Sequence, residues 1–141
     1  MTEMKRDASP SHVQSANGLV ASAKAQVREV QPDDVEGLLA QGAVLIDIRE
    51  LAELEAEGVI PGAVHAPRGG LEWSVDPASP TFIKALDPTK PVVLYCRSGS
   101  RSALAAQQVE KMGYGDVASL QGGIRRWKTE GRPVAAPQDL T

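Results

Sequence analysis

Two apolar runs without alternation narrow the folds that this chain can adopt. The first is Ala43 to Asp47 (AVLID), and the second is Pro91 to Tyr95 (PVVLY), which leads directly into Cys96. A strand covered on one face alternates apolar and polar side chains, whereas a strand of a parallel sheet covered on both faces is apolar throughout. The two runs therefore predict a parallel sheet between two layers of helices.

Helical and strand-like segments alternate along the rest of the chain. Pro32 and two acidic residues predict the first turn of a helix that runs to about Ala40 and stops at Gly42. Further helices are expected at 19–27, 50–57, 82–86, 102–112 and 124–130, and further strands at 27–30, within 60–66 and at 117–120. This alternation indicates the α/β class, as a single three-layer α/β/α domain with a mostly five-stranded parallel sheet and helices on both faces.

Residues 1–18 differ in composition from the rest of the chain. They mix Ser, Asn, Asp, Lys and Pro with few apolar side chains, which is typical of a flexible tail. The folded domain is expected to occupy residues 19–141. A chain of 141 residues with 42% hydrophobic content suits one domain with its own core.

The charge balance and the short apolar runs limit the partners that we expect. A net charge of -3, from 15 basic and 18 acidic residues, does not favour binding to nucleic acid or to a membrane surface, which need a basic excess. The longest apolar runs are far shorter than the about 20 residues of a membrane-spanning helix, and the N-terminus is charged where a signal peptide is apolar. We therefore expect a cytoplasmic protein whose anion recognition is local.

The chain has a single cysteine and two histidines. Cys96 cannot form an internal disulfide, and His12 and His65 provide no spaced ligand set for zinc. Neither a metal nor a cofactor is expected.

The loop that contains the cysteine is rich in cations and serine. This cysteine loop, residues 96–101, reads CRSGSR and holds no acidic residue. Ligands of open α/β sheets gather at the carboxyl ends of strands, and Gly99 allows the backbone to turn successive N–H groups toward one centre. A helix that starts near Ser102 adds its partial positive charge. Such a site stabilises an anion, and the nearest anion is the Cys96 thiolate.

Two interpretations of Cys96 compete. A free cysteine is often a small buried hydrophobe, and this reading is favoured for an isolated residue. An activated nucleophile needs a pKa below the free value of about 8.5, and a shift of about two units corresponds to about 2.7 kcal/mol. The helix terminus, the N–H groups and the arginines can supply that amount together, so the context favours a nucleophile.

Two long segments resemble the rhodanese-type sulfurtransferases. Residues 92–127 (VVLYCRSGSRSALAAQQVEKMGYGDVASLQGGIRRW) resemble the active-site half of that family, including the nucleophile loop and the Gly-Gly-x-x-x-Trp element. Residues 45–73 (LIDIRELAELEAEGVIPGAVHAPRGGLEW) resemble its Asp-x-Arg segment and its Gly-x-Ile-Pro-Gly-Ala turn. The likeness runs from about Val30 to Pro133, with Val59 where many members carry histidine. It implies a rhodanese-like fold and a single-domain sulfurtransferase.

The resemblance also implies covalent catalysis in two steps. The Cys96 thiolate would attack the outer sulfur of a donor such as thiosulfate, and the persulfide would pass that sulfur to cyanide, to a thiol or to a sulfur-accepting protein. Arg101 would brace the loop and stabilise charge, and Arg97 would attract an anionic donor, unless it is an ordinary surface charge. The other candidate substrate contacts are Ser98, Gly99, Ser100 and Ser102, with Arg68 and Trp73 as candidate pocket walls.

Four further polar or aromatic residues have structural interpretations. Asp47 is expected to bond the backbone of the turn after its strand, and Arg49 to pair with an acidic neighbour. His65 lies in an apolar strand without an acid–base partner, so we expect a packed histidine. Trp127, at helical spacing from Ile124, is expected in the core.

Two other functions stay open from the sequence. Phosphatases and arsenate reductases also place a cysteine and an arginine around an anion, but the phosphatase loop is Cys-x5-Arg, whereas four residues separate Cys96 from Arg101. The tighter ring suits one added sulfur atom better than a tetrahedral oxyanion. The other alternative is a non-enzymatic module that docks a partner, and retention of Cys96 in an intact loop counts against it.

Overall fold

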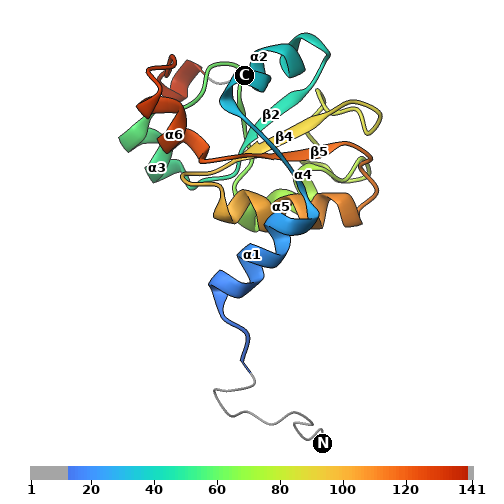
Figure 1. Ribbon diagram of the computed structural model, residues 1–141. Coiled ribbons are helices and arrows are strands. Elements are labelled where there is room, and N and C mark those ends of the chain that lie inside the picture. Colours follow the sequence, from blue (N-terminus) through green and yellow to red (C-terminus); the bar gives the residue numbers. More distant parts are fainter. Residues whose placement is uncertain (1–12, 140–141) are drawn as a thin grey trace, which may run out of the picture.

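A five-stranded parallel sheet forms the centre of the protein (Figure 1). The computed structural model describes residues 13–139. The strands are β1 (Arg28–Val30), β2 (Val44–Asp47), β3 (Val64–His65), β4 (Val92–Tyr95) and β5 (Val117–Leu120). Their spatial order is β1-β5-β4-β2-β3, and every pairing between them is parallel.

Helices cover both faces of this sheet, which gives three layers (Figure 1). The α-helices are α1 (Ala16–Gln26), α2 (Pro32–Ala40), α3 (Leu51–Glu57), α4 (Leu71–Ser74), α5 (Ser100–Lys111) and α6 (Gly123–Thr129). Two short 3-10 helices, η2 (Arg68–Gly70) and η3 (Pro137–Asp139), complete the described elements. In Figure 1 the helices α1, α4 and α5 lie below the sheet, α2 and α6 lie above it, and α3 lies beside α6. The predicted α/β architecture is confirmed.

Burial on both faces explains the missing alternation in the two apolar runs. In β2, Leu45 packs in the core cluster with α2 and α6, whereas Ile46 packs in the opposite cluster with α1 and α5. In β4, Val93 and Leu94 divide in the same way, and none of these four side chains is more than 1% exposed. Trp127 of α6 is buried in the same cluster as Leu45, on the α2 and α6 side of the sheet, as predicted.

The crossover connections place a crevice between β2 and β4. These strands are neighbours, but β2 leads through α3 to β3 on one side, whereas β4 leads through α5 to β5 on the other. A switch of direction of this kind opens a crevice at the carboxyl ends of the two strands, where ligands of α/β proteins bind. Cys96 follows β4 at this point.

The N-terminal helix starts earlier than the sequence predicted. It begins at Ala16 instead of Leu19, and the Ser15 Oγ accepts a hydrogen bond of 2.9 Å from the Gly18 N–H, which caps the first turn. Its buried residue Ala23 packs in the same core cluster as residues of α5, and Gln107 of α5 donates a hydrogen bond to Gln26. Residues 1–12 of the predicted tail lie outside the described residues.

The prediction of a helix at 82–86 is wrong. Phe82 donates its N–H to the Ser79 carbonyl and Leu86 donates to Ile83, so this segment consists of separate turns. The side chains of Phe82 and Ile83 pack against the core cluster on the α1 and α5 side of the sheet, and the Ile83 N–H donates to the Ser74 carbonyl. Core contacts therefore fix this segment, and the nearby helical turns are η2 and α4, in a stretch that was expected to be a loop.

Candidate active site

The carbonyl groups of the cysteine loop are bound to the start of α6. The Ile124 N–H donates to the Cys96 carbonyl at 3.0 Å, and the Arg125 N–H donates to the Arg97 carbonyl at 3.0 Å. A Cβ atom on Gly123 would lie 2.5 Å from these two carbonyl oxygens, so only glycine permits this approach. Because the carbonyls face α6, the loop N–H groups are free to face the cysteine sulfur.

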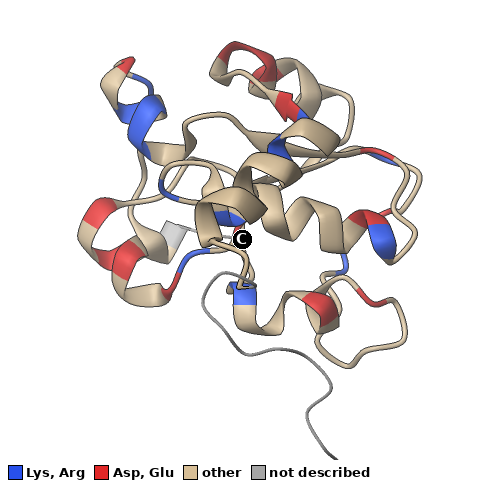
Figure 2. Ribbon diagram, turned by 60° about the horizontal axis from the view of Figure 1, so that its bottom comes forward, with Lys and Arg blue, Asp and Glu red and all other residues tan. Residues whose placement is uncertain are grey.

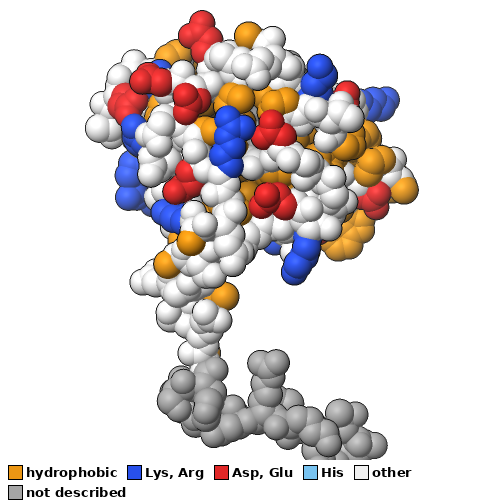
Figure 3. All heavy atoms as spheres, turned by 45° about the vertical axis from the view of Figure 1, so that its right-hand side comes forward, with side chains coloured by type: hydrophobic (Ala, Val, Ile, Leu, Met, Phe, Trp, Pro, Cys, Tyr) orange, Lys and Arg blue, Asp and Glu red, His pale blue; other side chains and the backbone are white. Residues whose placement is uncertain are grey.

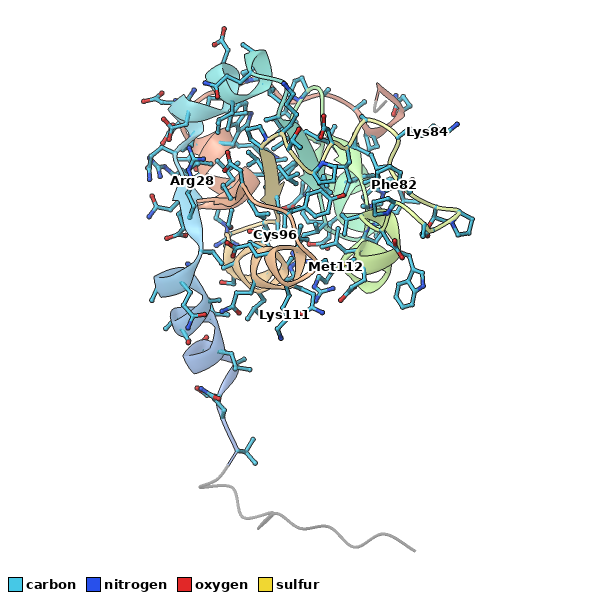
Figure 4. All side chains as sticks on the ribbon, turned by 90° about the vertical axis from the view of Figure 1, so that its right-hand side faces the viewer. Arg28, Phe82, Lys84, Cys96, Lys111 and Met112 are labelled. Atoms are coloured by element: carbon cyan, nitrogen blue, oxygen red, sulfur yellow. The ribbon has the colours of Figure 1, made fainter. Side chains whose placement is uncertain are left out.

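Cys96 lies between the end of β4 and the start of α5, inside the molecule (Figure 4). Only 1% of its surface is exposed. Gly99 has a left-handed φ of 100° and donates its N–H to the Cys96 Sγ at 3.2 Å. The Ser102 Oγ lies 3.5 Å from the same sulfur and accepts a hydrogen bond from the thiol when Cys96 is protonated. The sulfur therefore sits among polar groups at the bottom of the loop.

These contacts favour the thiolate. Burial alone would raise the pKa of the Cys96 thiol, but hydrogen bonds from the side chain and backbone of Ser102 and from the N–H groups of Gly99 and Ser98 oppose it. The net effect holds the Cys96 pKa below its ordinary value. All these donors belong to the loop or to the first turn of α5, where the helix dipole acts in the same direction.

Alkylation of Cys96 by iodoacetamide is expected to follow an apparent pKa below that of a free thiol, about 8.5. The rate measured across pH reports this residue alone, because the chain has one cysteine. The same protein unfolded in urea serves as the control and should titrate near the free value. A native pKa at or above that of the unfolded chain would contradict the thiolate site.

Both loop arginines pair with acidic residues of α3. Arg101 forms a bidentate pair with Glu53, with Nη1 and Nη2 at 2.9 and 2.7 Å from the two carboxylate oxygens. Arg97 is 52% exposed, and its Nε lies 3.5 Å from Glu57. The loop itself contains no acidic residue, but the fold brings Glu53 and Glu57 of α3 next to it. Arg101 thus links the start of α5 to α3, and part of its charge is neutralised.

The Glu53–Arg101 pair predicts how stability changes with pH. The hydrogen bond from Arg101 lowers the pKa of Glu53 to about 2. The folded pKa of Glu53 lies below its unfolded value of about 4.3. The pair therefore stabilises the folded protein fully above about pH 4.3, and this stabilisation is lost as the pH falls toward 2.

Glu53→Gln is therefore expected to lower the urea midpoint at about pH 7 and to differ less and less from the wild type below about pH 4. The glutamine can still accept the Glu50 N–H that caps α3. Glu55→Gln, an exposed change on the same helix, is the matched control. A difference for Glu53→Gln that stays constant down to about pH 2.5 would argue against this pair.

Arg49 joins the end of β2 to the end of α3. Its Nη2 donates to Asp47 Oδ2 and to the Gly58 carbonyl, each at 2.7 Å, and its Nη1 lies 3.3 Å from Glu57. Asp47 also accepts the Arg49 N–H at 3.0 Å, so both structural predictions for these residues are confirmed. His65 is half-buried, with its Nε2 2.7 Å from the Arg49 carbonyl. This network fixes α3, and with it Glu53 and Glu57, beside the cysteine loop.

The two candidate wall residues lie apart from the hydrogen bonds of the loop. Arg68 donates its N–H to Ile48 just after β2, and its side chain pairs with Glu72 at 3.0 Å. Trp73 of α4 is 61% exposed. Within residues 13–139, no hydrogen bond or ion pair joins either residue to the cysteine loop, so their contact with a substrate stays a prediction.

A hollow of about 230 Å³ adjoins the loop on its α6 side. Arg97, Arg125 and Lys128 line it, together with Glu57, Ile124 and Thr129. Figure 2 shows acidic and basic segments at many places on the ribbon, and Figure 3 shows side chains of both signs on one face. Three of the six residues that line the hollow are basic and one is acidic, so the hollow favours an anion.

Sequence reasoning missed three residues of the site. Glu53 and Glu57 had a detectable signal, because residues four apart on a helix share one face, but nothing in the sequence indicates which element that face meets. Ser119 is the one polar residue of β5, and its Oγ lies 2.7 Å from that of Ser102. A serine in an apolar strand gave the only indication of this contact.

Two features of the described part bear on ligands and membranes. None of its helices is long and apolar enough to cross a bilayer. Within the same residues, no group of three or more His, Cys, Asp or Glu side chains could hold a metal ion.

Comparisons with known proteins agree with this geometry. A family model of the rhodanese-like domain matches residues 31–130. A sulfurtransferase of Allochromatium vinosum is 35% identical over 114 residues, which cover 79% of this chain and 98% of that protein. The thiosulfate sulfurtransferase GlpE of Pseudomonas fluorescens is 34% identical over 104 residues, or 74% of this chain and 87% of that protein.

A solved structure extends the likeness over almost the whole chain. It comes from Rhodopseudomonas palustris, and the protein is described as one of unknown function and a possible tyrosine phosphatase. The TM-score is 0.80 at 32% identity, covering 94% of this chain and 99% of that one. The chain belongs to the rhodanese-like domain family, and the predicted resemblance to its single-domain sulfurtransferases is confirmed.

Proposed function

We propose that this protein transfers a sulfane sulfur from thiosulfate to a thiophilic acceptor through a persulfide on Cys96. The observation that carries the proposal is a single buried cysteine whose sulfur receives the Gly99 N–H at 3.2 Å and whose pKa is lowered by the loop around it. Membership of the rhodanese-like family supports the sulfur chemistry, and the relatives named thiosulfate sulfurtransferase support this donor.

The first step forms the persulfide. The Cys96 thiolate attacks the outer sulfur of thiosulfate, a bond forms between the two sulfur atoms, and the bond to the sulfonate sulfur breaks. The electron pair of that bond leaves with sulfite, and the negative charge of the enzyme moves to the outer sulfur. The N–H groups of Ser98, Gly99, Ser100 and Ser102 stabilise this charge, in the manner of an oxyanion hole.

The second step returns the thiolate. An acceptor such as cyanide attacks the outer sulfur, the bond between the two sulfur atoms breaks, and its electron pair returns to the Cys96 Sγ. The product with cyanide is thiocyanate. A thiol or a sulfur-accepting protein in the cytoplasm can serve in the same step, because the reacting atom of the enzyme is the same outer sulfur.

The two arginines have different roles in this scheme. Arg101 braces the loop through Glu53, since both of its Nη atoms are engaged there. Arg97 is half exposed beside the basic hollow, so it attracts an anionic donor toward the loop. Arg68 and Trp73 stay candidate walls of the same site.

Steady-state kinetics with thiosulfate and cyanide test this function. A covalent intermediate predicts ping-pong kinetics, in which plots of reciprocal rate at several cyanide concentrations are parallel. Sulfite and thiocyanate should appear in equal amounts. Intersecting lines, or no thiocyanate with either thiosulfate or glutathione persulfide as donor, would speak against the proposal.

A phosphatase is the second candidate, because the structural relative from Rhodopseudomonas palustris is described as a possible tyrosine phosphatase. The loop argues against this activity, since four residues separate Cys96 from Arg101 and the phosphatase pattern has five. The same preparation should therefore not hydrolyse p-nitrophenyl phosphate. Robust hydrolysis without thiocyanate formation would replace the sulfurtransferase with a phosphatase.

A further inference from the structure

A buried pair of hydroxyl groups extends from the cysteine into the sheet. The Ser102 Oγ lies 3.5 Å from the Cys96 Sγ, and the Ser119 Oγ lies 2.7 Å from the Ser102 Oγ. Both serines are fully buried, and Ser119 is in the middle of the apolar strand β5. Within residues 13–139 neither hydroxyl makes any other hydrogen bond.

The ionisation of Cys96 fixes the direction of this chain of hydrogen bonds. A thiolate can only accept, so the Ser102 hydroxyl must donate to it. The Ser102 oxygen is then free to accept, and the Ser119 hydroxyl donates to it. The hydrogen bond between the serines polarises Ser102 and keeps its proton directed at the sulfur.

We propose that Ser119 is a positioning residue for sulfur transfer, whose hydroxyl directs that of Ser102 toward the Cys96 sulfur. This inference rests on the proposed function for its effect on catalysis. Ser119 touches neither the substrate nor the reacting sulfur, and it acts through Ser102.

The two steps of transfer should depend on Ser119 differently. In the persulfide the negative charge is on the outer sulfur, whereas it returns to Sγ when the acceptor breaks the bond between the sulfur atoms. Stabilisation of Sγ therefore assists discharge, where Sγ is the leaving group. In persulfide formation Sγ is the nucleophile. A higher Cys96 pKa lowers the fraction of thiolate but makes each thiolate intrinsically more reactive, so the two effects on this step oppose each other.

The charged neighbours of this chain limit the alternatives. Glu29 of β1 is the Cα partner of Ser119, and the side chains of paired residues in adjacent parallel strands lie on the same face. Its Oε2 is buried without a partner, but no hydrogen bond joins it to Ser119. On the loop side, the charge of Arg101 interacts with that of Cys96. Glu29→Gln therefore tests whether charge in β1, instead of the hydroxyl pair, sets the properties of the thiolate.

The main experiment compares Ser119→Ala with Val117→Ala, a buried truncation in the same strand that leaves the hydroxyl pair intact. The Cys96 pKa is measured by alkylation, and discharge is measured by adding cyanide to protein already loaded with sulfur. For Ser119→Ala we expect a pKa increase of roughly half to one unit and a discharge roughly three- to tenfold slower. Above the new pKa, persulfide formation should differ from the wild type by no more than about twofold.

A double-mutant cycle separates positioning from loss of stability. Ser102→Ala already removes the hydroxyl that connects Ser119 to the Cys96 sulfur, so adding Ser119→Ala to it should not raise the Cys96 pKa further. Additive shifts would overturn the proposal, as would an unchanged pKa in Ser119→Ala or an equal shift in Val117→Ala. A fall of the Cys96 pKa in Glu29→Gln as large as the rise expected in Ser119→Ala would also overturn it, since loss of a negative charge near a thiolate lowers the pKa.

The two proposals can fail separately. If the wild type forms no persulfide, the proposed function fails, but the alkylation pKa still tests the hydroxyl pair. If persulfide forms and Ser119→Ala discharges it at the rate of the wild type, only the role of Ser119 fails.

Discussion

Cys96→Ser is expected to lower the rate of sulfur transfer from thiosulfate to cyanide by roughly 10³-fold or more. A serine hydroxyl is far less ionised than a thiol in the same loop, and an oxygen cannot form the persulfide. Cys96→Ala should be equally inactive. The measurement is the initial rate of thiocyanate formation at saturating donor and acceptor.

The control for this loss is Ser22→Ala, an exposed change on α1. It should leave the rate unchanged. Cys96→Ser should also keep a melting temperature near that of the wild type, because the new hydroxyl can use the same hydrogen-bond partners. Transfer by Cys96→Ser at more than about a tenth of the wild-type rate would mean that another group carries the sulfur.

Arg49→Met is expected to lower the free energy of unfolding by about 3–5 kcal/mol, because it leaves Asp47 buried and unpaired. Asp47 and Arg49 are both fully buried and lie 2.7 Å apart. The substitution also frees the Gly58 carbonyl and the Glu57 carboxylate at the end of α3. We therefore expect the cysteine loop to lose part of its support, with a higher Cys96 pKa in the protein that stays folded.

Urea unfolding with Arg28→Met as the matched control measures this effect. Arg28 forms an ion pair with Asp116 at 3.0 Å, but both side chains are about half exposed, so its loss should cost no more than about 1 kcal/mol. Equal losses for Arg49→Met and Arg28→Met would show that the buried network contributes no more than a surface pair.

The fold was predictable because its strongest signals are local. The runs at Ala43–Asp47 and Pro91–Tyr95 are apolar on both sides, and this property survives in β2 and β4 as burial on both faces. The prediction of a helix at 82–86 was wrong because contacts with the core hold Phe82 and Ile83, and a local sequence pattern does not encode those contacts.

The site was predictable where one short segment builds it. Cys96, Gly99 and Ser102 lie within seven consecutive residues, so the strand end, the loop and the helix start could be inferred together. Contacts between segments that are distant in the sequence could not be inferred in this way. Glu53 reaches Arg101 across 48 positions, and Ser119 reaches Ser102 from another strand.

These long-range contacts change how the loop is understood. The sequence suggested that the helix terminus, the loop N–H groups and the arginines lower the Cys96 pKa together. In the folded protein Arg101 is engaged by Glu53, and the donors that lower the Cys96 pKa are N–H and hydroxyl groups. The N–H and hydroxyl groups around the sulfur therefore lower the Cys96 pKa, and Arg101 holds the start of α5 to α3 through Glu53.

Intact-mass spectrometry after incubation with thiosulfate detects the persulfide on Cys96 itself. We expect the wild type to gain the mass of one sulfur atom, which digestion should locate on the peptide that contains Cys96, and cyanide should remove it with release of thiocyanate. Cys96→Ala should gain nothing. The absence of any adduct from thiosulfate and from glutathione persulfide, or an adduct that also forms in Cys96→Ala, would rule out sulfur transfer through Cys96.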